Sequence, residues 1–299
     1  MSTERKSMLA AGIAYSIFGL SYLFSKMALG VTEPTILLFV RFSITFLILN
    51  VLVLTKVMKL NLRGKKLGGP VLVGILQPVL YFILENYGLK YTTTSFTGIV
   101  SSISPIFTAI LGVIMLREKP NLRQWICIVL SIIGVLMVSL GNPGGENTLV
   151  GCLCLLGAYF VGALYSILIR SLSKDFSAFE LTYIMFVIGF VFFAALTFVQ
   201  YGGETVPMLA TALSDGKFIL AALYLGGLSS VVAYLLSNYA LAHLPVTRAT
   251  IFNSFATLVS VLSGVILMGD PFTVISAISF LLILAGVTGV NRFADKKMT

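Results

Sequence analysis

Residues 81–90 read YFILENYGLK, and a related stretch, SNYAL, lies at residues 237–241. The two align at an offset of 152 residues, which pairs Asn86 with Asn238 and Tyr87 with Tyr239. The same register continues toward the C-terminus in the matched pairs Leu89 and Leu241, Ile99 and Ile251, Ser102 and Ser254, Gly112 and Gly264, and Gly134 and Gly286. Matched asparagine, tyrosine and glycine residues in one ungapped register indicate an internal repeat rather than chance similarity between apolar segments.

The composition around these stretches is typical of a membrane protein. Of the 299 residues, 58% are hydrophobic and only 10% are charged, and the mean hydropathy is +1.02. A soluble domain has nearer a quarter of its residues charged. The apolar residues come in blocks of about twenty, the length of a helix that crosses a hydrocarbon core of ~30 Å. A β-barrel would show short alternating segments instead, so we expect an all-α membrane protein.

Ten transmembrane helices are predicted between turn signals such as GNPGGEN and GDP. They cover residues 7–29, 34–55, 70–89, 94–116, 122–140, 148–170, 179–200, 217–241, 246–268 and 272–291. The repeat makes spans one to five (residues 1–145) one five-helix unit and spans six to ten (residues 146–299) the other. Because five is odd, the second unit enters the membrane from the opposite side. Inverted repeats of this kind are typical of secondary transporters, in which the two halves exchange conformations.

The distribution of lysine and arginine predicts the orientation. The loops on one side carry only Lys90 and Lys217, whereas most other basic residues share a side with both termini. Cytoplasmic ends are enriched in lysine and arginine. Arg5 and Lys6 precede an apolar run too long for a signal-peptide core, so the first span is expected to stay uncleaved. We expect a multi-pass protein of the plasma (inner) membrane with cytoplasmic N- and C-termini.

Charge and motif content disfavour several other classes of function. The net charge of +9 is scattered over short loops, which argues against nucleic acid as a partner. Cys127, Cys152 and Cys154 have no metal-binding spacing, and His243 is the only histidine. The sequence contains no GxSxG motif and no P-loop, and no ring of like charge suggests a channel. We therefore expect no enzyme activity, no metal and no cofactor.

Several local patterns resemble those of one known family. They are FGLSYLFSK at 18–26, the segment 34–42 with Pro34 and Arg41-Phe42, ENYGLKYTTTS at 85–95, and SPIFTAILGVIMLREK at 104–119. With the five-plus-five organisation, they resemble the EamA-type members of the drug/metabolite transporter superfamily. This resemblance implies a substrate cavity between the repeats and solute export or exchange without ATP. The second repeat departs from the pattern where Thr257 replaces Pro105 and Asp270 replaces Glu118.

Helical spacing selects small and polar faces that would point away from lipid. The residues predicted to line the substrate cavity are Tyr15, Tyr22, Lys26, Arg41, Gln77, Tyr81, Glu85, Ser101, Ser104, Tyr159, Ser166, Ser229, Ser237 and Asn253. The alternative is that small and hydroxyl-bearing residues only let the helices pack closely. Spans five and ten lack such a face, and we expect them to form scaffold or a homodimer contact.

Glu85 is the most unusual residue of this set, because an ionisable group at membrane depth is costly unless it faces water or a partner. Three roles remain open from the sequence. Glu85 pairs with Arg41 or Lys26 as structural glue, or it binds a substrate amine while Arg41 binds a carboxylate, or it exchanges protons with solvent during transport.

The expected function is secondary transport of small polar metabolites, such as amino acids or related amines and acids, by exchange or proton coupling. Efflux of amphipathic drugs or toxic compounds is the alternative. The expected partners are a small-molecule substrate, the lipid bilayer and, in the coupled case, protons. Glu118 and Asp270 lie just before a span, where a carboxylate is expected to cap the start of the next helix.

Overall fold

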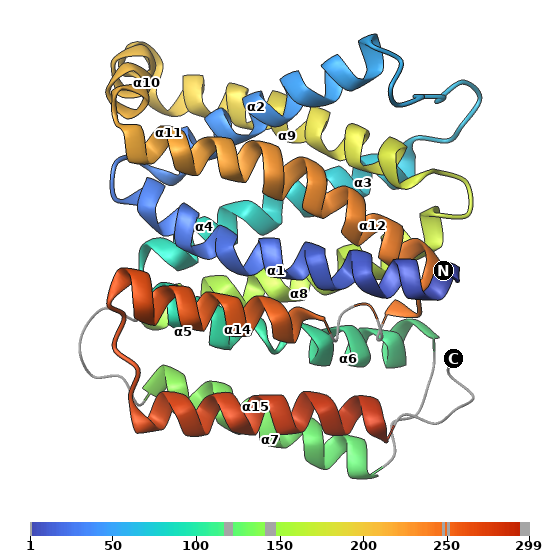
Figure 1. The fold of residues 1–299 in the computed structure, drawn as a ribbon, viewed down its shortest axis with the longest axis vertical. Coiled ribbons are helices and arrows are strands. Elements are labelled where there is room, and N and C mark those ends of the chain that lie inside the picture. Colours follow the sequence, from blue (N-terminus) through green and yellow to red (C-terminus); the bar gives the residue numbers. More distant parts are fainter. Residues whose placement is uncertain (1, 117–121, 141–147, 247–248, 250–251, 294–299) are drawn as a thin grey trace.

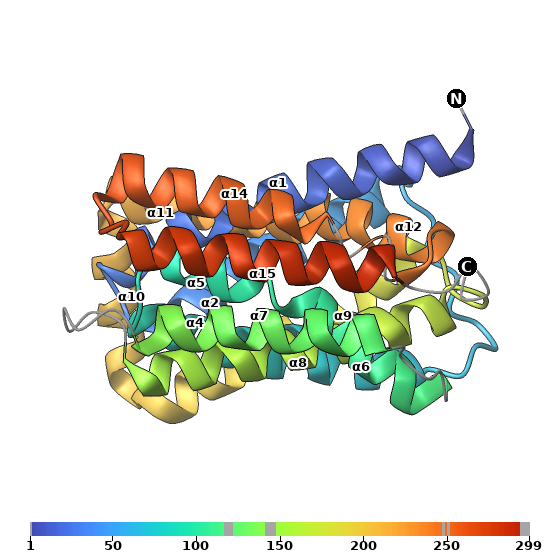
Figure 2. The same cartoon turned by 90° about the horizontal axis from the view of Figure 1, so that it is seen from below.

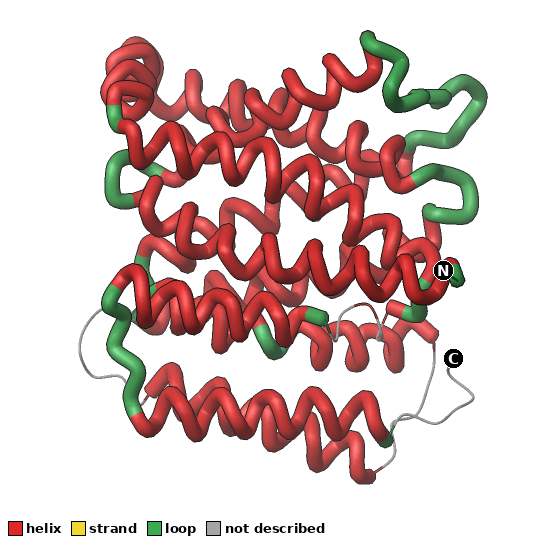
Figure 3. Tube along the Cα trace, viewed as in Figure 1, coloured by secondary structure: helices red, strands yellow, loops and turns green. Residues whose placement is uncertain are grey.

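A computed structural model describes residues 2–116, 122–140, 148–246, 249 and 252–293. Within these residues every regular element is a helix, and the long helices run roughly alongside one another in a single bundle (Figures 1 and 3). Seven helices, or runs of consecutive helices, are long and apolar enough to cross a membrane. Three shorter apolar helices cover Leu122–Val138, Asn253–Met268 and Val274–Gly289. The all-helical membrane architecture is therefore confirmed, while the count of ten spans stays a prediction.

The helices of the first half begin and end close to the predicted boundaries. They are α1 (Thr3–Leu29), α2 (Pro34–Leu54), α3 (Gly68–Gly74), η1 (Ile75–Leu80), α4 (Tyr81–Lys90), α5 (Thr94–Ser101), α6 (Ser104–Leu116) and α7 (Leu122–Leu140). Those of the second half are α8 (Leu149–Leu172), α9 (Ala178–Tyr201), η2 (Gly202–Glu204), α10 (Thr205–Ser214), α11 (Gly216–Leu223), η3 (Tyr224–Ala233), α12 (Tyr234–His243), α14 (Asn253–Ser263), η4 (Gly264–Met268) and α15 (Val274–Arg292). The short helix α10 was not predicted.

Two segments that the sequence predicts as continuous helices are interrupted. Gln77 has extended backbone angles (φ −142°, ψ 115°) between α3 and α4, next to Pro78, which has no N–H to donate. A turn at Ser102 and Ile103 separates α5 from α6. Both interruptions lie near the middle of a predicted span, so they bring irregular backbone into the centre of the bundle.

Hydrogen bonds near the ends of helices show that corresponding helices of the two halves run in opposite directions. At one end of the bundle, which we call the Tyr91 end, the Thr148 N–H before α8 donates to the Tyr91 oxygen after α4 at 3.1 Å. Helix α8 thus begins where α4 ends. Helices α2 and α9 are likewise antiparallel, because Thr35 donates to Gln200 at 3.0 Å near one end and Tyr183 donates to Asn50 at 3.1 Å near the other.

A basic side chain caps the equivalent helix in each half. Lys26 of α1 donates to the carbonyl oxygens of Leu89, at 3.0 Å, and Thr92. Arg170 of α8 donates in the same way to the carbonyl oxygen of Ala242 at the C-terminus of α12. Cations are favourable there because the last carbonyl groups of a helix have no intrahelical partner. Lys26 and Arg170 thus have the same structural role in the two halves.

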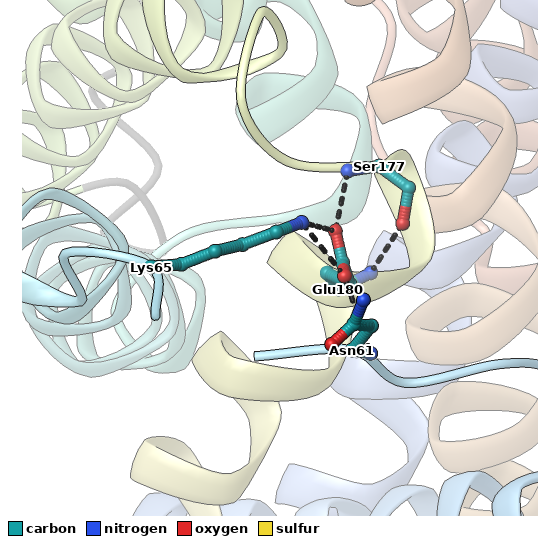
Figure 4. A network of polar contacts seen from close by, with 4 residues as sticks. All are labelled: Asn61, Lys65, Ser177 and Glu180. Carbon is teal, nitrogen blue, oxygen red and sulfur yellow. Dashed lines mark hydrogen bonds and ion pairs between the residues drawn. The ribbon is translucent and has the colours of Figure 1, made fainter. Parts of the chain in front are cut away.

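The opposite end of the bundle, which we call the Lys65 end, carries a partly buried polar network (Figure 4). Glu180, in the first turn of α9, accepts from Lys65 Nζ at 2.7 Å and from the backbone N–H groups of Ser177 at 2.8 Å and Asn61 at 3.3 Å. The Ser177 hydroxyl accepts from the Glu180 N–H, which completes a capping box. This network joins the α2–α3 loop to the start of α9.

Helices α7 and α15 form a pair along one edge of the bundle, and Figure 2 views the molecule from that edge. Their backbones approach closely: a Cβ on Gly134 would lie 2.9 Å from the Ser279 oxygen, and one on Gly286 would lie 2.5 Å from the Cys127 oxygen. Among the described residues, neither helix contributes a side chain to the cavity described next.

Candidate functional site

A cavity of about 80 Å³ lies among helices of both halves. It is lined by Tyr15, Phe18, Ser21, Tyr22, Arg41, Gln77, Tyr81, Phe82, Glu85, Ser104, Tyr159, Gly162, Tyr165, Ser166, Ser229, Tyr234, Ser237 and Asn253. All of the predicted cavity residues except Lys26 and Ser101 are in this set. The structure therefore brings together side chains that are up to 238 positions apart, from Tyr15 to Asn253.

The interruptions of the helices place part of this lining. Gln77 is buried, and its amide nitrogen donates to the hydroxyl of Tyr234 across the cavity wall. Ser104 begins α6 directly after the turn that ends α5. The Tyr165 hydroxyl donates to Asn238, whose amide donates to Thr182 at 2.9 Å.

Arg41 is the only cation among the described residues that line the cavity, and it is 2% exposed. Its Nε donates to Ser230 Oγ at 2.9 Å and its Nη2 donates to Ser229 Oγ at 3.1 Å. The guanidinium carbon lies 4.2 Å from the centre of the Phe82 ring, a cation–π distance. Ser229 also accepts from Ser21 of α1 at 2.8 Å. Arg41 is thus held by two hydroxyl groups of η3 and by the rings of Phe82 and, at 5.7 Å, Phe42.

In the part of the lining that the structure describes, Glu85 is the only acid, and it is 6% exposed. Its Oε1 accepts from the Tyr81 hydroxyl at 2.7 Å, one helical turn earlier in α4. Among the described residues, no lysine or arginine forms an ion pair with this carboxylate. The described residues thus form no direct ion pair with Glu85, and the three roles considered for it stay predictions.

Two predicted residues lie outside the lining for identifiable reasons. The ammonium group of Lys26 caps α4, as described above. Ser101 donates to the Gly98 oxygen at 2.7 Å, and its own backbone oxygen accepts from Asn253 Nδ2 at 2.6 Å. Its hydroxyl therefore satisfies backbone at the end of α5.

The sequence analysis missed six lining residues, namely Phe18, Ser21, Phe82, Gly162, Tyr165 and Tyr234. Helical spacing could have found Phe18, which lies between Tyr15 and Tyr22 on one face of α1, and Tyr234, which lies three residues before Ser237. Neither was predicted, because the cavity faces were chosen by their small and polar residues. Phe82 gives no such signal, since its role depends on the guanidinium group that lies over its ring.

Asp270 caps a helix, but not the one expected. Its Oδ2 accepts from the Ser95 N–H at 2.7 Å, in the first turn of α5. The start of α15 is capped instead by Thr273, which accepts from the Ser276 N–H at 3.2 Å. The prediction that Asp270 caps the next helix is therefore wrong, because the carboxylate reaches across to the other half. The corresponding prediction for Glu118 lies outside the described residues.

An all-helical membrane bundle with a polar cavity between two related halves is the arrangement of a membrane transporter. The EamA-like transporter family matches the chain twice, at residues 5–140 and 149–292, and the chain belongs to this family. The resemblance drawn from the sequence is thus confirmed.

Named relatives and a solved structure agree with this assignment. The chain is 35% identical to the uncharacterized transporter YcxC of Bacillus subtilis (strain 168) over 291 residues, which are 96% of this chain and 93% of the relative. It is 24% identical to an uncharacterized transporter of Archaeoglobus fulgidus, over 96% of this chain and 99% of the relative. A solved structure, titled "Crystal structure of protein", aligns with a TM-score of 0.66 at 17% identity, covering 96% of this chain and 99% of its own. That alignment shows the fold alone.

Proposed function

We propose that this protein is a secondary active transporter that exports or exchanges small polar metabolites, such as amino acids or related amines and acids. Transport proceeds by alternating access between two inverted five-helix repeats, which together make ten spans. The observation that carries the proposal is a cavity, lined from both halves, whose described lining includes the buried side chains of Arg41 and Glu85. Charged groups at membrane depth face ligand or ion pathways in most membrane proteins.

The size and polarity of the cavity favour a small solute. Pockets for drug-sized ligands enclose about 300–1,000 Å³ and are lined mainly by apolar groups. This cavity has a volume of about 80 Å³, and its wall includes the polar side chains of Arg41, Gln77, Glu85 and Asn253. A polar solute of a few heavy atoms fits this description better than an amphipathic drug does.

One observation favours the second candidate, multidrug efflux. Eight aromatic side chains line the cavity, namely Tyr15, Phe18, Tyr22, Tyr81, Phe82, Tyr159, Tyr165 and Tyr234. Their faces suit flat or cationic drugs. This function requires a larger cavity in another conformation, and a broad substrate profile would reveal it.

The proposed setting is the plasma (inner) membrane, with the Lys65 end and both termini in the cytoplasm. Glu85 is the candidate carrier of protons, since no other described residue of the cavity lining is an acid. A homodimer through the α7–α15 edge, with its many lipid-exposed apolar side chains, stays a prediction.

Counterflow into liposomes tests the proposed function. Purified protein is reconstituted into liposomes, which are loaded with separate pools of amino acids, amines or carboxylic acids. Exchange of labelled solute is then followed with and without a pH gradient. Glu85→Gln is measured beside Glu204→Gln, a control that removes an exposed acid outside the cavity. We expect exchange of at least one small polar solute. If transport is coupled to protons, a pH gradient should drive uptake only when Glu85 is intact. Movement of a broad drug panel and of none of the three pools would overturn the proposal.

A further inference from the structure

The loop between α2 and α3 carries a cluster of basic side chains at the Lys65 end (Figure 1). Five of the thirteen residues 55–67 are lysine or arginine, and the chain has no acid between Glu33 and Glu85. Lys65 is paired with Glu180, as described above. The other four are exposed, and among the described residues no acid pairs with them. We call these four the basic platform: Lys56, Lys59, Arg63 and Lys66.

Apolar side chains that alternate with the platform anchor it to the bundle. Met58, Leu60 and Leu62 are partly buried and pack against the large hydrophobic core cluster. Lys59 and Asn61, which lie between them in the sequence, are exposed. Successive side chains of an extended chain point to opposite sides, so burying one set presents the other to the surroundings. The basic side chains are thus held on the outer face of the loop.

Hydrogen bonds order the backbone that carries these cations. The Met58 N–H donates to the Leu52 oxygen at 3.1 Å, where α2 ends. Further along, the Lys65 N–H donates to the Leu62 oxygen at 3.2 Å and closes a turn. Gly64 is the third residue of that turn, and glycine adopts its φ of 77° without steric cost. A loop whose backbone is already ordered loses less entropy when a partner binds.

The platform lies beside helix ends that face lipid. Val51 and Leu54, in the last turn of α2, are apolar side chains exposed on the surface of the bundle, and so are Leu72 and Ile75 after the loop. In a protein that spans a bilayer, such side chains contact acyl chains, whereas cations extend to the headgroups. The four cations are therefore placed at the depth of lipid phosphate groups.

The corresponding loop of the second half has no such cluster. Residues 202–215 join α9 to α11 and contain Glu204 and Asp215 but no lysine or arginine. An excess of basic residues near the span ends is enough to set the orientation of a membrane protein. Orientation does not require four cations on one anchored loop without an acid. The platform therefore indicates an anionic ligand on one side of the membrane.

We propose that the basic platform binds the phosphate group of an anionic phospholipid, whose acyl chains lie along the exposed ends of α2 and α3. Clusters of about four or more lysine and arginine residues directly beside a transmembrane helix are typical of such binding. The site lies outside the cavity and does not depend on which solute the protein carries. Because Asn61 and Lys65 of the same loop bind Glu180 of α9, the lipid also stabilises the junction between the two halves.

Thermal unfolding of the full-length protein in a neutral detergent tests the site. Phosphatidylglycerol and phosphatidylcholine with the same acyl chains are added in separate titrations, so that the two ligands differ in their headgroups alone. A ligand that binds the folded protein alone raises the midpoint of unfolding. Glycerol phosphate is titrated beside them, because it carries the same phosphate chemistry without acyl chains.

The native protein should distinguish the two lipids by charge. Each cation near an anionic lipid surface strengthens attachment about fivefold. We therefore expect phosphatidylglycerol to raise the midpoint at concentrations at least about tenfold lower than phosphatidylcholine. In about 1 M salt the screening length falls to about 3 Å, so the difference between the two lipids should disappear.

Two variants with equal loss of charge assign the effect to the loop. The platform variant combines Lys56→Gln, Lys59→Gln, Arg63→Gln and Lys66→Gln. The control variant removes four exposed cations from the same end of the bundle but outside the loop, namely Arg5→Gln, Lys6→Gln, Lys174→Gln and Arg292→Gln. We expect the platform variant to respond to the two lipids alike, and the control variant to keep the native preference within about threefold.

Three results would overturn the lipid site. Equal responses of the native protein to the two lipids, or equal losses of preference in the two variants, would show that the platform does not select a charged headgroup. Glycerol phosphate acting at the concentrations of phosphatidylglycerol would assign the platform to a soluble anion instead. If the platform variant does not fold, Lys59→Gln with Arg63→Gln is compared with Arg5→Gln and Lys6→Gln. None of these measurements uses transport, so their outcome is independent of the proposed function.

Discussion

At the residue scale, Gly226 controls how closely η3 approaches Arg41. A Cβ at Gly226 would lie 2.8 Å from the Arg41 backbone oxygen and 2.7 Å from Ile44 Cβ. At the adjacent Gly227, the nearest atom to an added Cβ is Ile48 Cδ1 at 3.6 Å, an ordinary contact. The two glycines share a helical segment but differ in the space around them.

This difference gives a stability prediction with its own control. Gly226→Ala should lower the midpoint of thermal unfolding in detergent, because overpacking against backbone typically costs about 1–3 kcal/mol. Gly227→Ala should be neutral or stabilising, since alanine is the better helix former. Equal shifts for the two variants would contradict the close packing of α2 against η3.

Single residues also show why the sequence identifies part of the site and not all of it. Polar residues at helical spacing on an apolar chain are conspicuous, and Gln77, Tyr81 and Glu85 could be found in that way. Lys26 is equally conspicuous, yet its charge caps a helix. Sequence spacing shows which residues share a face, but it does not show whether a charged group reaches ligand or backbone.

At the scale of elements, a carboxylate lies at the start of both α9 and α2, but the two differ in how exposed they are to water. Glu180 accepts from Lys65 and from two backbone N–H groups, and its side chain is 6% exposed. Glu33, before α2, pairs with Lys90 at 2.6 Å, but its side chain is 42% exposed. Water screens the second pair far more than the first.

We therefore expect Glu180→Ala to be clearly more destabilising than Glu33→Ala. The first variant removes a cap and leaves two partly buried N–H groups without their carboxylate acceptor, a loss of roughly 1–3 kcal/mol. The second removes an exposed ion pair, which is typically worth about 0–1 kcal/mol. Thermal unfolding of both variants measures the difference. A larger loss for Glu33→Ala would show that the network at the Lys65 end does not stabilise the fold.

The elements explain how far periodicity predicts the fold. Helix ends marked by proline or by a capping side chain, such as Pro34 and Ser177, were located within one or two residues. The break at Gln77 and the turn at Ser102 were not predicted, because the apolar pattern continues through both. Helix α10 was missed because its ten residues are too few to resemble a span.

At the scale of the whole molecule, the antiparallel relation of the two halves predicts which loops share a side of the membrane. Lys66, at the Lys65 end, and Gly203, after α9, are both exposed and lie at opposite ends of the bundle. In a variant with Cys127, Cys152 and Cys154 changed to alanine, we introduce Lys66→Cys or Gly203→Cys.

An impermeant maleimide should label intact cells only through the cysteine introduced at position 203. The cysteine at position 66 should react after the membrane is permeabilised, because basic loops stay in the cytoplasm. Labelling of both positions from outside would contradict the predicted orientation and the transmembrane separation of these loops.

The two charges of the cavity come from the first half only: Arg41 lies in α2 and Glu85 in α4, while Ser237 occupies the place equivalent to Glu85. In the proposed alternating-access cycle, the site in one state is therefore not related to the site in the other by the two-fold symmetry of the halves. We expect such a carrier to have unequal apparent affinities at its two faces. At solute concentrations between those affinities it would act as a kinetic rectifier that carries most solute one way, although every step remains reversible.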